Sequence, residues 1–169
     1  VITNKILESI TKLSEQFGIK LYGDLQCSSQ VGKVSKFSGF DLITPTEKES
    51  RIALEDNESG IEWIANTLMN NTNSKNMLIK LGSDGFIAYG NTKSSIERQN
   101  FPALVVNPVD VTGAGDSLFA AMSVSLSSGA SLIEASAIGV CMASLAVKEV
   151  GNTAITKEKL SNCIADILN

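Results

Sequence analysis

The chain of 169 residues is 43% hydrophobic, carries a formal net charge of −4 and contains no histidine. Its length suits one domain with a sizeable core, and its acidic balance argues against nucleic acid as a partner, because phosphate backbones are bound by clustered Lys and Arg. The lack of histidine in the sequence excludes Ser-His and Cys-His catalysis and the common histidine-containing zinc sites.

The first half of the chain alternates helical and extended patterns. Apolar residues recur at helical spacing near the N-terminus, and Gly18 follows as a typical helix end. The patterns predict, in chain order, a helix at 2–17, a strand at 19–25, a strand at 40–44, a helix at 61–68 and an Asn-rich surface loop at 70–73. Trp63 is expected in the core, on the inner face of its helix.

The second half continues with strands and then long helices. In chain order, we expect a buried strand at 77–81, a turn at 82–85, a hairpin partner at 86–89, an extended segment at 95–100, helices at 113–128 and 132–149, and a last helix capped by Thr156. The helix at 132–149 opens with the capping box Ser131–Glu134 and is apolar almost all round, so it is expected to be buried. The alternation predicts an α/β three-layer sandwich with a mainly parallel sheet flanked by helices.

One segment between the last strand and the long helices is rich in chemical information: Asp110-Val111-Thr112-Gly113-Ala114-Gly115-Asp116. Glycines let backbone N–H groups approach an anion closely, and a helix N-terminus adds unpaired donors and a partial positive charge. The alternative is an ordinary helix start with an acidic first turn. Glycine costs about 1 kcal/mol relative to alanine in a helix, which favours the anion site.

The stretch D-V-T-G-A-G-D-S-L-F resembles the signature of the ribokinase-like (PfkB) carbohydrate kinases. The resemblance implies that the amides of Gly113, Ala114 and Gly115 form an anion hole for the transferred phosphoryl group. It implies that Asp116 deprotonates the sugar hydroxyl that attacks the γ-phosphate of ATP. It also implies a ribokinase-like fold.

The resemblance spans the whole chain but only the second half of a typical family member. Residues 1–169 are therefore expected to be the nucleotide-binding and catalytic portion of a ribokinase-like domain. The N-terminal half and the lid, which hold most sugar contacts, are absent from this chain, so by itself it is expected to be an incomplete enzyme. Exposure of a sheet edge would favour a homodimer or self-association.

Two further clusters follow strand ends. Thr46-Glu47-Lys48-Glu49 is similar to the family's Pro-Asn-x-x-Glu segment, which implies that Glu49 orients the waters of Mg²⁺ and that Thr46 stands where Asn faces the phosphates. The same residues form a capping box, and both interpretations can hold together.

Residues 80–85 resemble the Thr-Leu-Gly-x-x-Gly turn along the nucleotide, which implies nucleotide contacts from Lys80, Gly82, Ser83 and Gly85. The alternatives are a simple hairpin turn and a solvated Lys80.

The resemblance also implies a monovalent-cation site, such as one for K⁺, at Asp110 and Thr112, completed by the loop around Gly151. The alternative is that both side chains cap a helix start. Asp24 and Gln26 follow the first strand. One interpretation gives them a role in binding metal or phosphate, but the favoured interpretation is that water solvates them at the strand end.

The adenine is expected to rest against the buried helix. Many family members that bind adenine carry Asn where this chain has Val140. The resemblance therefore implies apolar contacts from Val140, Ala143 and Ser144.

The predicted function is ATP-dependent, Mg²⁺-assisted phosphoryl transfer to a hydroxyl of a sugar or sugar phosphate. The block Leu-Ile-Thr-Pro-Thr-Glu at residues 42–47 is similar to the branch acting on heptose phosphates. Two alternatives stay open: a non-catalytic nucleotide- or anion-binding or regulatory module, and a kinase of a nucleoside or vitamin-precursor alcohol. Without a membrane-spanning run or signal peptide, and with Cys141 and Cys163 in apolar helical patterns, a cytoplasmic protein with no membrane partner is expected.

Overall fold

The structure is a computed structural model that describes residues 2–24, 34–91, 96–105, 107–151 and 153–168. The chain forms two compact units. The first, here called the sheet unit, comprises Val1–Leu81 and Ile87–Gln99, and the second, here called the helical unit, comprises Gly82–Phe86 and Asn100–Asn169.

The five strands form one sheet in the order β1-β2-β3-β4-β5. Their bounds are Tyr22–Gly23 for β1, Leu42–Ile43 for β2, Asn76–Lys80 for β3, Phe86–Asn91 for β4 and Ile96–Phe101 for β5. β2 pairs in parallel with both β1 and β3. The N–H of Asn91, at the end of β4, donates to the carbonyl of Lys75, just before β3, so β4 runs back along β3. The predicted α/β class and the hairpin after residue 81 are confirmed.

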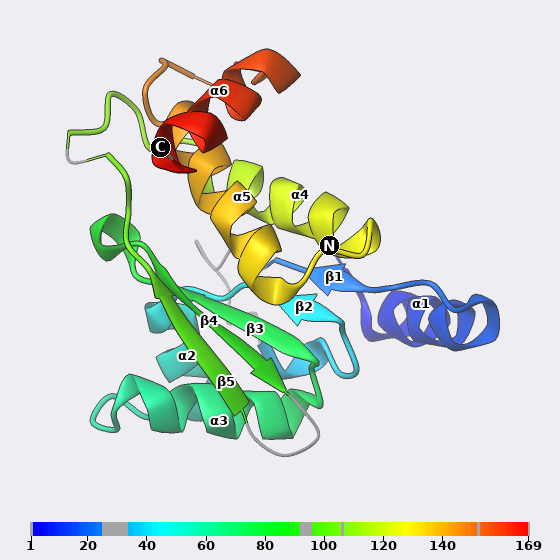
Figure 1. Cartoon of the computed structure of the whole chain (residues 1–169). Coiled ribbons are helices and arrows are strands. Elements are labelled where there is room, and N and C mark those ends of the chain that lie inside the picture. The colour runs from blue at the N-terminus through cyan, green and yellow to red at the C-terminus, as the bar shows by residue number, and fades with distance from the viewer. Residues whose placement is uncertain (1, 25–33, 92–95, 106, 152, 169) are drawn as a thin grey trace. The chain divides into compact units, whose positions relative to one another are not determined.

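Helices α2 (Glu47–Leu54) and α3 (Ile61–Thr72) cover the sheet unit on one side and pack against each other and β3, as Figure 1 shows. A short 3-10 helix, η1 (Val34–Lys36), also contacts both helices. The core beneath them consists of apolar side chains exposed by 9% or less, among them Val34, Phe40, Ile43, Ile64, Leu68, Met69, Met77 and Ile79. Burial of this area is the main force that holds the unit together.

Helix α1 (Asn4–Phe17) forms where predicted, between the N-cap Thr3 and a left-handed Gly18 at φ 64°. Its apolar stripe is not buried in this chain. Ile6, Ile10, Leu13 and Phe17 are 37–63% exposed, whereas Leu7 is 9% exposed. The pattern predicted the helix correctly, but of these five residues only Leu7 joins the core of the sheet unit.

In the helical unit, α4 (Ala114–Ser127) and α5 (Leu132–Ala146) pack side by side, and α6 (Lys157–Leu168) packs on α5 (Figure 1). A Cβ on Gly139 would lie 2.7 Å from Leu118 Cδ1 and 2.9 Å from Met122 Cγ, so glycine allows the close approach of α4 and α5, and a larger residue would displace these two side chains. The predicted capping box at Ser131–Glu134 and the cap at Thr156 are both confirmed.

Three local predictions are wrong. Residues 70–72 continue α3, which ends at a left-handed Asn73 with φ 48°, because Thr72 is buried on the core side of the helix. Trp63 is 51% exposed, since the core face of α3 is made by its neighbours Ile64 and Ala65. Helix α5 is not buried all round: Ile133 is 55% exposed.

Candidate functional site

The N-terminus of α2 is closed by the predicted capping box. Thr46 Oγ1 accepts a hydrogen bond from the N–H of Glu49 at 3.1 Å, and Glu49 Oε2 accepts one from the N–H of Thr46 at 2.7 Å. The two bonds satisfy donors that a helix start leaves unpaired. Glu49 is only 8% exposed, so its carboxylate is held in one place at the edge of the sheet unit.

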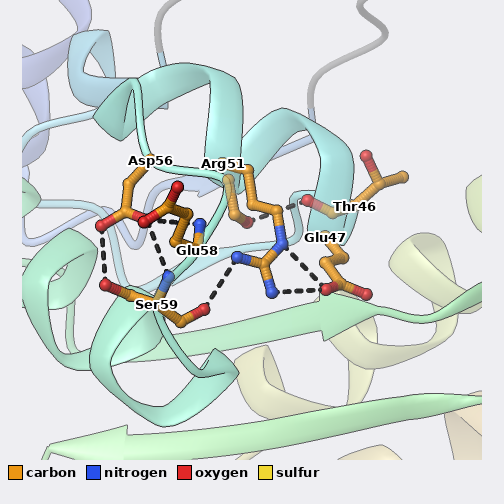
Figure 2. Close-up of polar contacts among 7 residues, drawn as sticks. Thr46, Glu47, Arg51, Asp56, Glu58 and Ser59 are labelled. Carbon is orange, nitrogen blue, oxygen red and sulfur yellow. Dashed lines mark hydrogen bonds and ion pairs between the residues drawn. The ribbon is translucent and has the colours of Figure 1, made fainter.

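Arg51 fixes the helix that carries this capping box. Figure 2 shows its guanidinium between Glu47 and Ser59: Nε and Nη2 donate to Glu47 Oε1 at 2.9 and 2.8 Å, and Nη1 donates to the carbonyl of Ser59 at 2.8 Å. Ser59 in turn donates to Asp56 through its N–H and its hydroxyl. These bonds lower the pKa of Asp56 below its ordinary value. The contacts bind α2 to the loop that leads into α3.

The ends of the three parallel strands meet in a polar cluster, as expected for one edge of a parallel sheet. Asp24 follows β1, Thr44 follows β2, and Lys80 ends β3. Asp24 Oδ1 accepts hydrogen bonds from Thr44 Oγ1 at 2.6 Å and from Lys80 Nζ at 2.8 Å. The side chains of Lys80 and Asp24 are 17% and 12% exposed, so strand-end solvation is wrong for Asp24, for which it was the favoured interpretation, and for Lys80, for which it was the alternative to a nucleotide contact. Gln26 lies outside the described residues.

Lys80→Met is expected to destabilise the chain by about 3 kcal/mol, because it leaves the largely buried Asp24 carboxylate without its counter-charge. Lys159→Met is the matched control: it removes a lysine paired with Glu149, but the two side chains are 49% and 35% exposed. A surface pair of this kind contributes less than about 1 kcal/mol. Urea unfolding of both variants measures the difference, and equal losses would contradict a structural role for the Lys80–Asp24 pair.

In the helical unit, the start of α4 has the backbone geometry of an anion site. Gly113 is the N-cap in the left-handed region at φ 75°, and no side chain in the described part of the chain caps the helix. The N–H groups of a first turn have no partners within the helix itself. The N–H of Ala114 makes a long turn bond of 3.3 Å to the carbonyl of Val111. Asp116 lies in the first turn and is exposed.

Asp110 clamps the loop before α4 to the loop after α5. Its Oδ1 accepts the N–H of Thr112 and its Oδ2 accepts the N–H of Gly151, both at 2.9 Å. The hydrogen bonds from Thr112, and then that from Gly151, hold the pKa of Asp110 below its ordinary value. Asp110, Thr112 and the loop at Gly151 are thus brought together, in the combination that the sequence predicted.

The turn after β3 is a 3-10 helix, η2 (Gly82–Asp84), followed by Gly85 at φ +89°. A Cβ on Gly85 would lie 2.1 Å from the carbonyl oxygen of Phe101 and 2.7 Å from the nitrogen of Ala103. The rings of Phe86 and Phe101 stack beside this contact, with centroids 5.1 Å apart. Gly85 is therefore required by close backbone packing, a reason that the motif did not indicate.

Of the three residues predicted to contact adenine, Ser144 is 5% exposed. Its hydroxyl donates to the carbonyl of Cys141 at 2.7 Å and lies 3.7 Å from Cys163 Sγ on α6. Val140 and Ala143 are partly buried on α5. An adenine contact from any of the three stays a prediction, as does the meeting of residues from both units around one nucleotide.

Comparison with known proteins adds to this geometry. A family model described as pfkB family carbohydrate kinase matches residues 3–159. The chain belongs to the pfkB family. The family predicted from the D-V-T-G-A-G-D motif is therefore confirmed.

Relatives of this pfkB chain include the bifunctional protein HldE of Syntrophotalea carbinolica, which is 26% identical over 169 residues, covering 98% of this chain and 33% of that protein. Escherichia coli phosphofructokinase-2 in complex with potassium superposes with a TM-score of 0.78 at 20% identity, over 99% of this chain and 54% of that chain. Arabidopsis thaliana ribokinase complexed with ribose and ATP superposes with a TM-score of 0.80 at 22% identity, over 96% of this chain and 53% of that chain. At these identities the two structures establish the ribokinase-like fold. The pfkB chain spans about a third of the length of the curated relatives it matches.

Among the residues that the structure describes, no three His, Cys, Asp or Glu side chains are grouped to hold a metal ion, and no helix has the length and apolar character to cross a bilayer. The carboxylates of Glu49 and Asp24 already accept hydrogen bonds at 2.6–2.8 Å. These residues fit contact with the waters around Mg²⁺ better than direct ligation, because Mg²⁺ keeps several waters when phosphates bind it.

Proposed function

We propose that this chain is the nucleotide-binding and catalytic portion of a carbohydrate kinase that transfers the γ-phosphoryl group of ATP to a hydroxyl of a sugar or sugar phosphate. The observation that carries the proposal is the start of α4, where a left-handed Gly113 opens an uncapped first turn in the described part of the chain and Asp116 stands exposed in that turn. Family membership supports the reaction type. The contacts to the acceptor would come largely from other parts of the kinase.

The chemistry assigned to this loop is positioning and charge stabilisation. The N–H groups of Gly113, Ala114 and Gly115 would hold the γ-phosphoryl oxygens. The 3.3 Å bond from Ala114 to Val111 is long enough for this N–H to be shared with a phosphate oxygen. Asp116 would take the proton of the attacking hydroxyl, which suits an exposed carboxylate in the first turn of a helix.

Magnesium would neutralise charge on the phosphates of ATP. Glu49 would hold the waters around it, with one carboxylate oxygen kept in place by the N–H of Thr46 at 2.7 Å. Thr46 stands at the usual Asn position. Its hydroxyl oxygen accepts the N–H of Glu49, so its O–H would be the group that faces the phosphates. Lys80, whose charge is balanced by Asp24 at the same strand ends, would contact the phosphates through ammonium N–H groups that the pair leaves available.

Glu49→Gln in the full-length kinase is expected to raise the Mg²⁺ concentration needed for half-maximal rate by about tenfold, the usual scale for losing a residue that orients metal-bound groups. Gln keeps an oxygen for the N–H of Thr46, so the stability loss should stay within about 1 kcal/mol. Glu134→Gln is the matched control, because Glu134 closes the second capping box of the chain at α5. If the two variants have the same Mg²⁺ dependence, Glu49 is a capping residue alone.

A monovalent cation is proposed beside the loop of α4. The carboxylate of Asp110 accepts hydrogen bonds of 2.9 Å from the backbone N–H groups of Thr112 and Gly151, and so joins the two loops that would surround the cation. Escherichia coli phosphofructokinase-2, which shares the fold, has been solved with potassium. Carbonyl groups of the two loops would provide the oxygen ligands.

The acceptor is proposed to be a heptose phosphate or a related sugar phosphate, on the similarity of residues 42–47 to that branch and the relation to HldE proteins. ADP release by the full-length kinase, measured over a panel of hexoses, heptoses, their phosphates, nucleosides and vitamin-precursor alcohols, tests this choice. Stimulation by sugars or sugar phosphates supports it, and stimulation only by a non-sugar alcohol contradicts it.

Thr46 and Val140, at positions where the family often has Asn, favour the alternative of a non-catalytic nucleotide-binding module. In that case no acceptor stimulates ADP release.

A further inference from the structure

Two cysteines lie together where α6 packs on α5. Cys141 is on α5 and 3% exposed, and Cys163 is on α6 and partly exposed. Ser144 is three residues after Cys141, so its side chain projects from the same side of α5. The 3.7 Å contact between Ser144 Oγ and Cys163 Sγ therefore brings the α6 cysteine to the face of α5 that carries Cys141.

The hydrogen bonds define how these groups are arranged. The single hydroxyl proton of Ser144 is donated to the carbonyl of Cys141 at 2.7 Å. In the 3.7 Å contact the S–H of Cys163 is then the donor and Ser144 Oγ the acceptor. Both cysteines are present as thiols. This is a dithiol pair with one partly accessible member and one buried member.

We propose that Cys141 and Cys163 are a site of reversible oxidation, at which a disulfide joins α6 covalently to α5. The oxidant is a small-molecule disulfide such as oxidised glutathione. The proposal does not depend on the kinase assignment, since it rests on the packing of two helices within the helical unit.

The exchange occurs in two balanced steps. The thiolate of Cys163 attacks one sulfur of oxidised glutathione, which forms a mixed disulfide and releases one glutathione thiolate that takes up a proton. The Cys141 thiol then loses its proton and attacks the sulfur of Cys163, which forms the protein disulfide and releases the second glutathione. The two cysteines lose two electrons and two protons, and oxidised glutathione gains both.

The order of the steps follows from the surroundings of the two thiols. Burial, together with the neighbouring Cys163 thiol, raises the pKa of Cys141 to about 11. A thiol of this kind is a poor first nucleophile, because the thiolate is the reactive form. Cys163 is accessible to the oxidant and reacts first, and Cys141 resolves the mixed disulfide from within the helix interface.

Tryptic mapping of the 169-residue chain after exposure to oxidised glutathione tests the site. Trypsin cuts after Lys148, Lys157 and Lys159, so Cys141 and Cys163 fall on separate peptides, 99–148 and 160–169. The expected result is that the two peptides stay joined, about 2 Da lighter than their summed masses, until a reductant is added. The joined form should unfold about 5 °C or more above the reduced form, because the link restricts the unfolded chain.

Cys27→Ser is the control, since it removes the third cysteine of the sequence and leaves the pair intact. It should keep the joined peptides, whereas Cys163→Ser should lose them and keep a normal melting curve. The proposal is overturned if the folded Cys27→Ser protein yields only separate peptides, with or without glutathione attached, or if the link forms only after unfolding in urea.

Discussion

Asp116→Asn in the full-length kinase should lower turnover by about 100-fold or more while ATP affinity changes little, because Asn cannot accept the proton of the acceptor hydroxyl. The exposed position of Asp116 in the first turn of α4 means that the substitution removes no described core contact. Steady-state kinetics with a separate measurement of ATP binding resolves the two effects.

Asp166→Asn is the control for this prediction. It makes the same charge change on an exposed residue of α6, in the same helical unit. This variant should keep normal turnover. If Asp116→Asn also turns over at the wild-type rate, Asp116 is not the base, and the acceptor must lose its proton to another group or to water.

Gly85→Ala should cost about 3 kcal/mol or more of unfolding free energy. The new methyl group would lie 2.1 Å from the carbonyl oxygen of Phe101, and φ is +89°, where alanine is strained. Neither backbone segment can move away without breaking the contact between the turn and the end of β5.

Gly82→Ala separates the two causes. Gly82 also has a positive φ of +65°, but its Cβ would meet no described atom within 4 Å. Only backbone strain is expected there, about 1 kcal/mol. Thermal or urea unfolding of both variants gives the comparison, and equal losses would show that the close approach to Phe101 is not what requires glycine at 85.

Helix positions were predictable from the sequence because their end signals are local. Thr46 and Ser131 each sit three residues before a Glu, and in both cases the structure forms the reciprocal bonds of a capping box. Gly18 ends α1 in the left-handed conformation that glycine favours. These interactions span a few residues and need no knowledge of the rest of the fold.

Burial was harder to predict because it depends on which face of a helix finds a partner. The apolar stripe of α1 has the correct spacing for a core helix, yet Leu13 and Phe17 are 49% and 63% exposed. Trp63 has the same difficulty: its neighbours Ile64 and Ala65 fill the core, so the largest apolar side chain of the helix points outward. Helical periodicity defines a face but not its neighbour.

The candidate site shows the same division. The loop around Gly113 could be predicted because its signal lies in adjacent residues. The contact between Asp110 and Gly151 could be predicted because the family motif implies it. The Lys80–Asp24 pair joins residues 56 positions apart, and only the register of three parallel strands brings them together. Positions at strand ends were the available signal, and they indicated a shared edge without indicating an ion pair.

Phosphorus NMR of the full-length kinase with ATP, Mg²⁺ and the acceptor that best stimulates ADP release tests the central claim most directly. The expected result is a new phosphomonoester resonance on the acceptor that grows in step with ADP and fails to grow at the same rate with Asp116→Asn. ATP that binds the protein yet keeps all three of its phosphorus resonances in the presence of every acceptor would contradict phosphoryl transfer and leave a nucleotide-binding module.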